Sequence, residues 1–187
     1  LSSNSNSRGP RIRVNLGDAR SLVLYAASID LILTSPPYLN AIDYIRCSKF
    51  SLVWMGHTID ELSATRSASV GAEASSEEAL DDSGVRSIMQ ELKLRPALSN
   101  RNNAILARYV WDMRRALREA ARVLVRNGRA IYVVGDSTVR GTFIRNSEIV
   151  RATGEVCGLT LHQRRSRTLP ANRRYLPPPT SSIGQAP

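Results

Sequence analysis

Residues 29–38 read IDLILTSPPY, and this stretch decides the fold. Its first six residues are a short apolar run that is typical of a buried parallel strand. Ser35, Pro36 and Pro37 then stop the strand, because prolines fix φ and lack the N–H that strand pairing needs. We therefore expect a strand over residues 29–34 that ends in a rigid loop carrying the aromatic ring of Tyr38.

The segments on either side of this strand also have clear patterns. Residues 11–16 (RIRVNL) alternate polar and apolar side chains as a strand does, and Gly17-Asp18 marks a turn after them. After the loop, Asn40 can cap a helix that runs to about Met55 and stops at Gly56. A strand, a turn, a second strand and a helix are therefore expected in this order.

The second half of the chain repeats the alternation. Residues 104–125 carry apolar side chains three or four positions apart, which predicts a long amphipathic helix ended by Asn127-Gly128. Residues 129–134 (RAIYVV) predict another buried strand, and residues 158–163 predict a weaker one. The order predicts an α/β fold with a mostly parallel sheet and flanking helices.

Loops that follow parallel strands gather at the carboxyl edge of a sheet, where active residues are expected. Three loops are expected there, namely residues 17–20 (GDAR), 35–38 (SPPY) and 135–137 (GDS).

Charge suggests a polyanionic partner. The 187 residues include 26 Lys and Arg against 16 Asp and Glu, which gives a net charge of +10. Nearly all of the basic residues are arginine, which can bind phosphate through two donors. The alternative is that a GC-rich genome produces this composition and that most arginines simply face solvent.

Composition excludes several classes of protein. No apolar run approaches the roughly 20 residues of a membrane span. Cys47 and Cys157 are too few for a disulfide framework or a four-ligand zinc site, and His57 and His162 are isolated, so no metal is expected. Residues 1–10 are polar and predict no signal peptide, which favours a cytoplasmic location. The missing initiator Met suggests that the true start lies elsewhere.

The SPPY loop offers groups that suit a planar ring with an exocyclic amino group. The amine's two N–H bonds would go to Ser35 Oγ and the Pro36 carbonyl, while Tyr38 stacks on the ring. Accepting both hydrogen bonds favours a pyramidal nitrogen whose lone pair can be aimed at an electrophilic methyl group. The alternative is that the loop is only a stiff turn at the end of a strand.

Residues 30–46 (DLILTSPPYLNAIDYIR) strongly resemble the signature of the DNA amino-methyltransferases, which methylate cytosine N4 or adenine N6 with S-adenosylmethionine. The resemblance gives Ser35, Pro36, Pro37 and Tyr38 the catalytic roles. It also implies that Thr34 and Ser35 contact the cofactor and that Tyr38 and Asn40 contact a base flipped out of duplex DNA. Serine preceded by threonine favours cytosine N4 over adenine N6.

The same resemblance extends to two further regions. Asp18 lies seventeen residues before Ser35, where family members have an acidic residue that binds the adenine amino group of the cofactor. Its alternative role is to cap a short helix beginning near Ala19. Arg140 and Arg145 follow the GDS loop, on the edge where DNA is expected to dock.

The chain departs from the family in one respect. Members hold the methionine part of the cofactor against a glycine-rich loop, but the eleven glycines here include no GxG pair. We therefore expect an N-terminally truncated frame with a partial Rossmann-like fold that lacks its first strands and binds the cofactor weakly or not at all. Alternatives are an RNA base methyltransferase with the same loop, or a non-catalytic basic fragment that binds nucleic acid.

The predicted organisation has four parts. Residues 11–56 form the first part of the catalytic domain, and 57–103 a mobile or helical insertion with an acidic first half. Residues 104–176 form the remainder of the catalytic domain, and 177–187 a disordered tail. The oligomeric state is left open.

Overall fold

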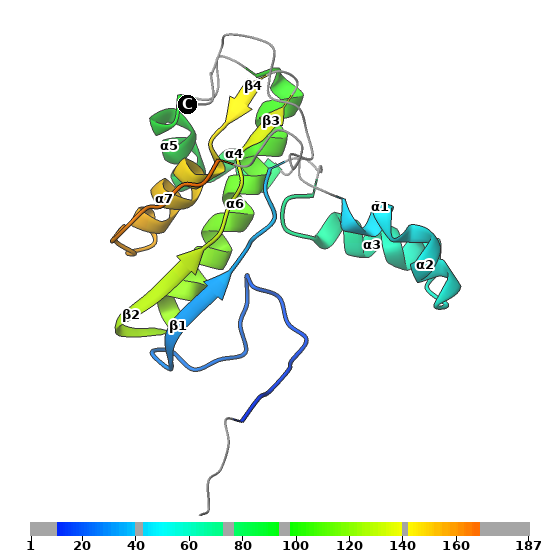
Figure 1. Cartoon of the computed structure of the whole chain (residues 1–187). Helices are drawn as coiled ribbons and strands as arrows, with labels where there is room; N and C mark the ends of the chain where they lie inside the picture. Colours follow the sequence, from blue (N-terminus) through cyan, green and yellow to red (C-terminus); the bar gives the residue numbers. More distant parts are fainter. Residues whose placement is uncertain (1–10, 40–42, 73–76, 94–97, 140–141, 169–187) are drawn as a thin grey trace, which may run out of the picture.

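The chain has a mixed α/β fold, seen in a computed structural model that describes residues 11–39, 43–72, 77–93, 98–139 and 142–168 (Figure 1). The elements are β1 (Ile29–Thr34), α1 (Tyr44–Cys47), α2 (Lys49–Trp54), α3 (Ile59–Ala68), α4 (Glu77–Asp81), α5 (Ser83–Glu91), α6 (Asn100–Val123), β2 (Leu124–Tyr132), β3 (Ser137–Val139), β4 (Thr142–Ile144) and α7 (Asn146–Val156). A two-stranded parallel sheet and the helices α4, α5 and α7 pack around the long helix α6, a short antiparallel hairpin lies beyond the sheet, and α1–α3 project away from this body.

The strand before the SPPY loop is confirmed, with the expected bounds. β1 pairs in parallel with β2, and Ile32 lies opposite Ala130 while Thr34 lies opposite Tyr132. The Val133 N–H donates to the Thr34 carbonyl at 2.9 Å, so the pairing continues one step past β2. The loops that follow the two strands therefore leave the sheet side by side.

The expectation that these strands are buried is wrong for one face of the sheet. Leu31, Leu33, Ile131 and Val133 are all exposed, whereas Ile32 and Tyr132 are half-buried on the side of α6. Among the described elements, helices cover only the inner face, and β1 pairs with β2 alone. An apolar run cannot distinguish burial on one face from burial on both.

The long amphipathic helix is confirmed and begins a few residues earlier than expected. Ser99 caps it by accepting a hydrogen bond from the Asn102 N–H through its side chain. Its buried face forms most of the core and includes Leu106, Tyr109, Val110, Met113 and Leu117. Side chains of α5 and α7 complete this core, among them Val85, Ile88, Met89, Ile149 and Ala152.

Two predicted strands are not formed. Residues 11–16 are irregular and pair with no described strand, and Ile12, Val14 and Leu16 are exposed. Residues 158–163 are also irregular. Alternation of apolar side chains stabilises a strand only where the segment pairs with a sheet and packs against a covering face, and neither segment pairs with a described strand.

The expected helix stop at Asn127-Gly128 is wrong, because both residues lie inside β2. The helix ends at Val123, and the chain enters the strand directly at Leu124. Asn127 has φ of 65°, a left-handed conformation that asparagine tolerates better than most residues. The Asn-Gly pair therefore marks a local irregularity in the strand.

The predicted helix over residues 40–55 forms as two short helices, α1 and α2, which meet at Ser48. Its expected cap, Asn40, lies outside the described residues. Gly56 ends α2 as expected, with φ of 96°. The chain then turns back into α3, which begins with a capping box between Thr58 and Glu61.

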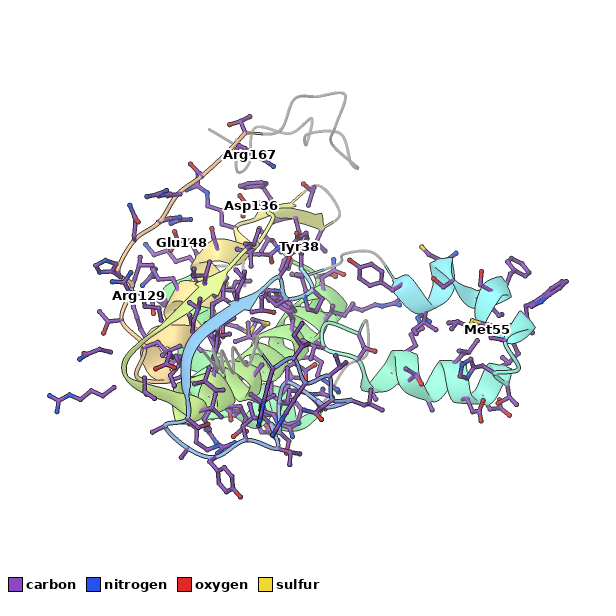
Figure 2. All side chains as sticks on the ribbon, turned by 60° about the horizontal axis from the view of Figure 1, so that its bottom comes forward. Tyr38, Met55, Arg129, Asp136, Glu148 and Arg167 are labelled. Carbon is purple, nitrogen blue, oxygen red and sulfur yellow. The ribbon has the colours of Figure 1, made fainter. Side chains whose placement is uncertain are left out.

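Residues 43–68, here called the arm, extend away from the body of the molecule (Figures 1 and 2). Asp43 and Arg66 form an ion pair that joins the two sides of the arm at its base, and Leu62 is buried. The remainder of the predicted insertion differs, because α5 contributes three side chains to the core. The boundaries at 57 and 103 stay a prediction.

Candidate functional site

Ser35 lies immediately after β1, where its hydroxyl is exposed but already oriented. Its Oγ donates a hydrogen bond to the Val133 carbonyl at 3.0 Å. A serine hydroxyl has one proton and two acceptor lone pairs. Because Val133 takes the proton, the remaining capacity of Ser35 Oγ is to accept a hydrogen bond.

A side chain of α6 holds the corner formed by Pro36 and Pro37, here called the diproline corner. The Tyr109 hydroxyl donates to the Pro37 carbonyl at 3.0 Å, and Tyr109 is fully buried. Burial raises the pKa of Tyr109, with a smaller contribution from Tyr38 nearby, so this hydroxyl stays protonated and remains a donor. No hydrogen bond to the Pro36 carbonyl forms among the described residues.

The ring of Tyr38 packs against the loop that follows β2. A Cβ at Gly135 would lie 3.1 Å from Cε2 of Tyr38, which is closer than side chains normally allow. Glycine therefore permits this approach. Figure 2 shows Tyr38 and Asp136 at the same end of the two strands. Two of the three loops expected at the carboxyl edge, SPPY and GDS, are thus brought together.

Asn146 holds the second loop in place. It is fully buried at the start of α7, and its Nδ2 donates to the Gly135 carbonyl at 2.8 Å and to Ser137 Oγ at 2.7 Å. Because Gly135 contacts Tyr38, these bonds also fix the surface on which the aromatic ring rests.

Asp136 has an unusual electrostatic environment for a partly exposed carboxylate. Burial of the group raises its pKa, while the charges of Arg145 and Arg164 and the backbone N–H groups at the start of α7 act in the opposite direction. Arg145 itself is exposed beside this helix N-terminus. The other predicted nucleic-acid contact on this side, Arg140, lies outside the described residues, as Asn40 does.

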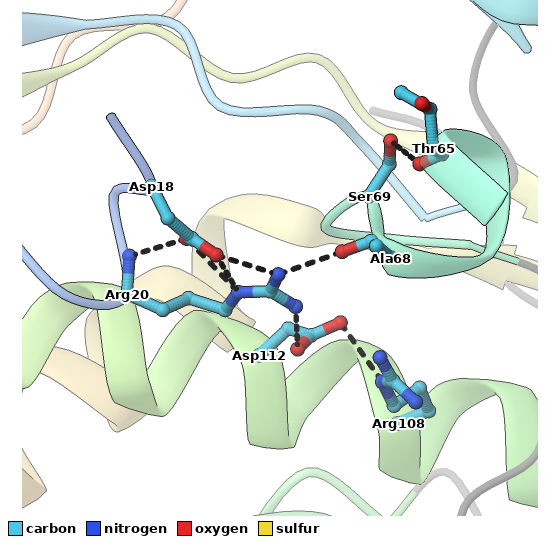
Figure 3. A network of polar contacts seen from close by, with 7 residues as sticks. All are labelled: Asp18, Arg20, Thr65, Ala68, Ser69, Arg108 and Asp112. Carbon is cyan, nitrogen blue, oxygen red and sulfur yellow. Dashed lines mark hydrogen bonds and ion pairs between the residues drawn. The ribbon is translucent and has the colours of Figure 1, made fainter. Parts of the chain in front are cut away.

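Asp18 is held in a separate network of polar contacts beside α6 (Figure 3). Arg20 donates to its carboxylate from the backbone N and from two side-chain nitrogens. These hydrogen bonds lower the pKa of Asp18. Arg20 also binds the fully buried Asp112 at 2.7 Å, and Arg108 binds the other oxygen of Asp112 at 3.0 Å.

The predicted third loop, GDAR, is joined through Arg20 to Asp112 of α6 and to the Ala68 carbonyl at the end of α3. Asp112 lies three residues after Tyr109, about one helical turn away. The turn at Asp18 is present, since the Ser21 N–H donates to the Asp18 carbonyl at 3.0 Å. Among the described residues, Asp18 makes no hydrogen bond or ion pair with the SPPY loop.

The three comparisons, with family models, curated proteins and solved structures, return no match for this chain. Within the described ranges, no helix is long and apolar enough to cross a membrane. The same part of the chain contains no group of three or more His, Cys, Asp or Glu residues placed to hold a metal ion.

Tyr109 and Asn146 shape the site but were not predicted from the sequence, and Gly135 was predicted only as part of the GDS loop. Tyr109 precedes Val110 on the buried face of the long helix, and a phenol buried there needs a hydrogen-bond partner. Gly135 opens the loop that follows a strand, a place where glycine often permits close approach. Asn146 gives no comparable signal in the sequence.

Proposed function

We propose that this chain belongs to an S-adenosylmethionine-dependent DNA amino-methyltransferase that modifies the exocyclic amine of a flipped base, cytosine N4 in preference to adenine N6. The finer expectation, a partial Rossmann-like methyltransferase fold, is part of this proposal. Its support is the resemblance of residues 30–46, together with the parallel strand pair that carries the SPPY and GDS loops at one end.

One observation carries the proposal: some polar atoms of the loop are already hydrogen-bonded within the protein, and others can still accept a hydrogen bond. Ser35 donates to Val133 and is left as an acceptor, and the Pro37 carbonyl is engaged by Tyr109 while the Pro36 carbonyl is not. An aromatic amine has two N–H donors, so two acceptors on one rigid corner match it. With both N–H bonds accepted, the nitrogen lone pair turns out of the ring plane and becomes nucleophilic.

The aromatic ring of Tyr38 supplies the remaining contact. A base that leaves the duplex loses stacking worth a few kcal/mol, and stacking on Tyr38 would offset part of this cost. Gly135 supports the ring from the other loop, so Tyr38 is held in position before the base arrives. A pre-positioned ring is a better platform because less conformational freedom is lost on binding.

The described residues fit only part of the cofactor. The Asp18 carboxylate is half-exposed and rigidly held by Arg20, which suits hydrogen bonding to an adenine amine. The chain has no GxG pair to approach the methionine portion, and no residue is assigned to that portion. When bound, S-adenosylmethionine supplies the electrophilic methyl group. The contribution of this chain's own loop is to bind and orient the amine.

Methyl transfer from labelled S-adenosylmethionine tests the proposal, with the full-length protein as the enzyme. Duplex DNA is expected to become labelled, and Ser35→Ala or Tyr38→Ala is expected to lower the rate about a hundredfold. The matched controls are Ser28→Ala and Tyr25→Ala, which alter a serine and a tyrosine away from the loop. Equal rates for loop variants and controls would refute the proposed roles.

The choice of substrate separates the alternatives. Labelling of transfer RNA with no labelling of DNA would support an RNA base methyltransferase, because the amine chemistry is the same for both polymers. Binding of DNA with no transfer by the complete protein would support a non-catalytic nucleic-acid-binding protein. Identification of the modified base by mass spectrometry then distinguishes cytosine N4 from adenine N6.

A further inference from the structure

The arm exposes large apolar side chains that the core does not use. Phe50 is 89% exposed, Trp54 is 92% exposed and Met55 is 74% exposed. Phe50 and Trp54 are four residues apart on α2, so they lie on the same face of the helix. Figure 2 shows Met55 at the outer end of the arm, away from Tyr38. A grouped apolar surface of this kind indicates a binding partner.

The charged side chains of the arm are unevenly distributed between its helices. α1 and α2 contain Arg46 and Lys49 and no acidic residue. The acidic side chains of α3, Asp60 and Glu61, lie in its first turn. Asp43, which precedes α1, is paired with Arg66 of α3, so Arg46 and Lys49 are the charged side chains of the two helices that bear Phe50 and Trp54.

This charge distribution disfavours a second copy of the chain as the partner. In a symmetric pair, the same surface of each copy meets, so the basic residues of one α1–α2 segment would face those of the other. The net charge of +10 adds repulsion between whole molecules. A polyanion has the opposite charge and is attracted by the same residues.

We propose that this arm surface, consisting of Arg46, Lys49, Phe50, Trp54 and Met55, binds double-stranded DNA beside the target base. The proposal rests on the proposed function, which makes DNA the substrate. Arginine and lysine contact phosphates, whereas exposed aromatic and apolar side chains enter a groove or insert between base steps. The arm begins at residue 43, only five residues after Tyr38, so it extends from the loop that would hold the flipped base.

Fluorescence of Trp54 tests the proposal directly. The chain has two tryptophans, so Trp111→Phe leaves Trp54 as the sole reporter. Trp111 lies on α6 between the guanidinium groups of Arg108 and Arg115, and phenylalanine keeps an aromatic ring there. Adding a short mixed-sequence duplex to the full chain is expected to quench Trp54, and added salt is expected to reverse the quenching.

Binding of a labelled duplex, followed by anisotropy, gives the size of the effect. Phe50→Ala combined with Trp54→Ala is expected to raise Kd about tenfold or more. Arg46→Gln combined with Lys49→Gln is expected to reduce the slope of log K against log salt by about two. The control is Tyr25→Ala, a residue of the body that is 88% exposed, which is expected to change neither quantity.

The proposal is overturned if DNA binding leaves Trp54 fluorescence unchanged, if the double alanine variant binds as the parent does, or if no binding occurs. It is also overturned if sedimentation velocity shows self-association that this variant abolishes, because the surface would then bind a second copy. Failure of the proposed function gives a different result. Quenching of Trp54 without any methyl transfer would support DNA binding by the arm surface and refute the proposed methyltransferase activity. Methyl transfer by the parent, with the same Kd for the double alanine variant as for the parent, would support the activity and refute DNA binding by the arm surface.

Discussion

Replacing Tyr109 with phenylalanine isolates one hydrogen bond beneath the diproline corner. The ring keeps its place in the core, and only the hydroxyl that donates to the Pro37 carbonyl at 3.0 Å is removed. A net hydrogen bond contributes about 0.5–1.5 kcal/mol, and a carbonyl left without its partner adds to the loss where water reaches it poorly. Pro37 is half-buried, so we expect a total loss of about 1–2 kcal/mol in the free energy of unfolding.

Urea denaturation measures this loss, and a shift in midpoint at constant slope would show that stability alone has changed. Tyr132→Phe is the matched control, since Tyr132 is also largely covered and, in the described part of the structure, its hydroxyl makes no hydrogen bond. We expect the control to change stability by less than about 0.5 kcal/mol.

The same variant tests whether the hydrogen bond serves the loop. If Tyr109 positions the corner, Tyr109→Phe lowers the rate of methyl transfer by more than its loss of stability explains, because the fraction folded stays near one. If Tyr109→Phe and the control Tyr132→Phe lost the same stability and the same activity, the reasoning would be refuted. The hydrogen bond from Tyr109 to the Pro37 carbonyl would then contribute neither to stability nor to the position of the loop.

Three further perturbations follow from the contacts described above. Gly135→Ala places a Cβ 3.1 Å from the ring of Tyr38, so we expect near-native urea stability with slower methyl transfer, and unchanged transfer would contradict the contact. Asp112→Asn removes the buried charge shared by two arginines and is expected to cost about 2–4 kcal/mol, against almost nothing for the exposed control Asp30→Asn. Arg122 and the Leu22 N–H lower the pKa of Glu119 from 4.5 to about 2, so its contribution to stability is full above about pH 4.5 and is lost as the pH falls toward 2. Melting temperatures of Glu119→Gln should lose that part of the acid dependence, and an unchanged profile would contradict it.

The local signals around the SPPY loop were sufficient to predict its strand and position. Residues 29–34 are apolar and β-prone, and two prolines follow them, so propensity and the stop signal agree. The long helix was predictable for a similar reason, because its apolar face persists over several turns. Neither prediction required knowledge of distant contacts.

Features that depend on tertiary partners were not predictable. Residues 11–16 have the pattern of a strand, but the described structure gives them no neighbour to pair with. Asn127 and Gly128 are typical of a helix stop, whereas the helix ended earlier and the strand continued through them. The hairpin of β3 and β4 is too short for periodicity to reveal.

The candidate site was predicted in part for the same reason. Ser35 and Tyr38 follow from the motif, but the partners that orient them come from β2 and α6, far away in the sequence. Asp18 was expected beside them, yet it is paired with Arg20, which in turn pairs with Asp112 of α6.

The outer face and free edge of the small sheet have a practical consequence. Leu31, Leu33, Ile131 and Val133 face outward, and β1 offers backbone groups that no described strand uses. Such edges recruit strands from other molecules and seed precipitation. Concentrated preparations are therefore expected to scatter light and to bind hydrophobic dyes. Leu33→Lys is expected to reduce this light scattering without altering the SPPY loop.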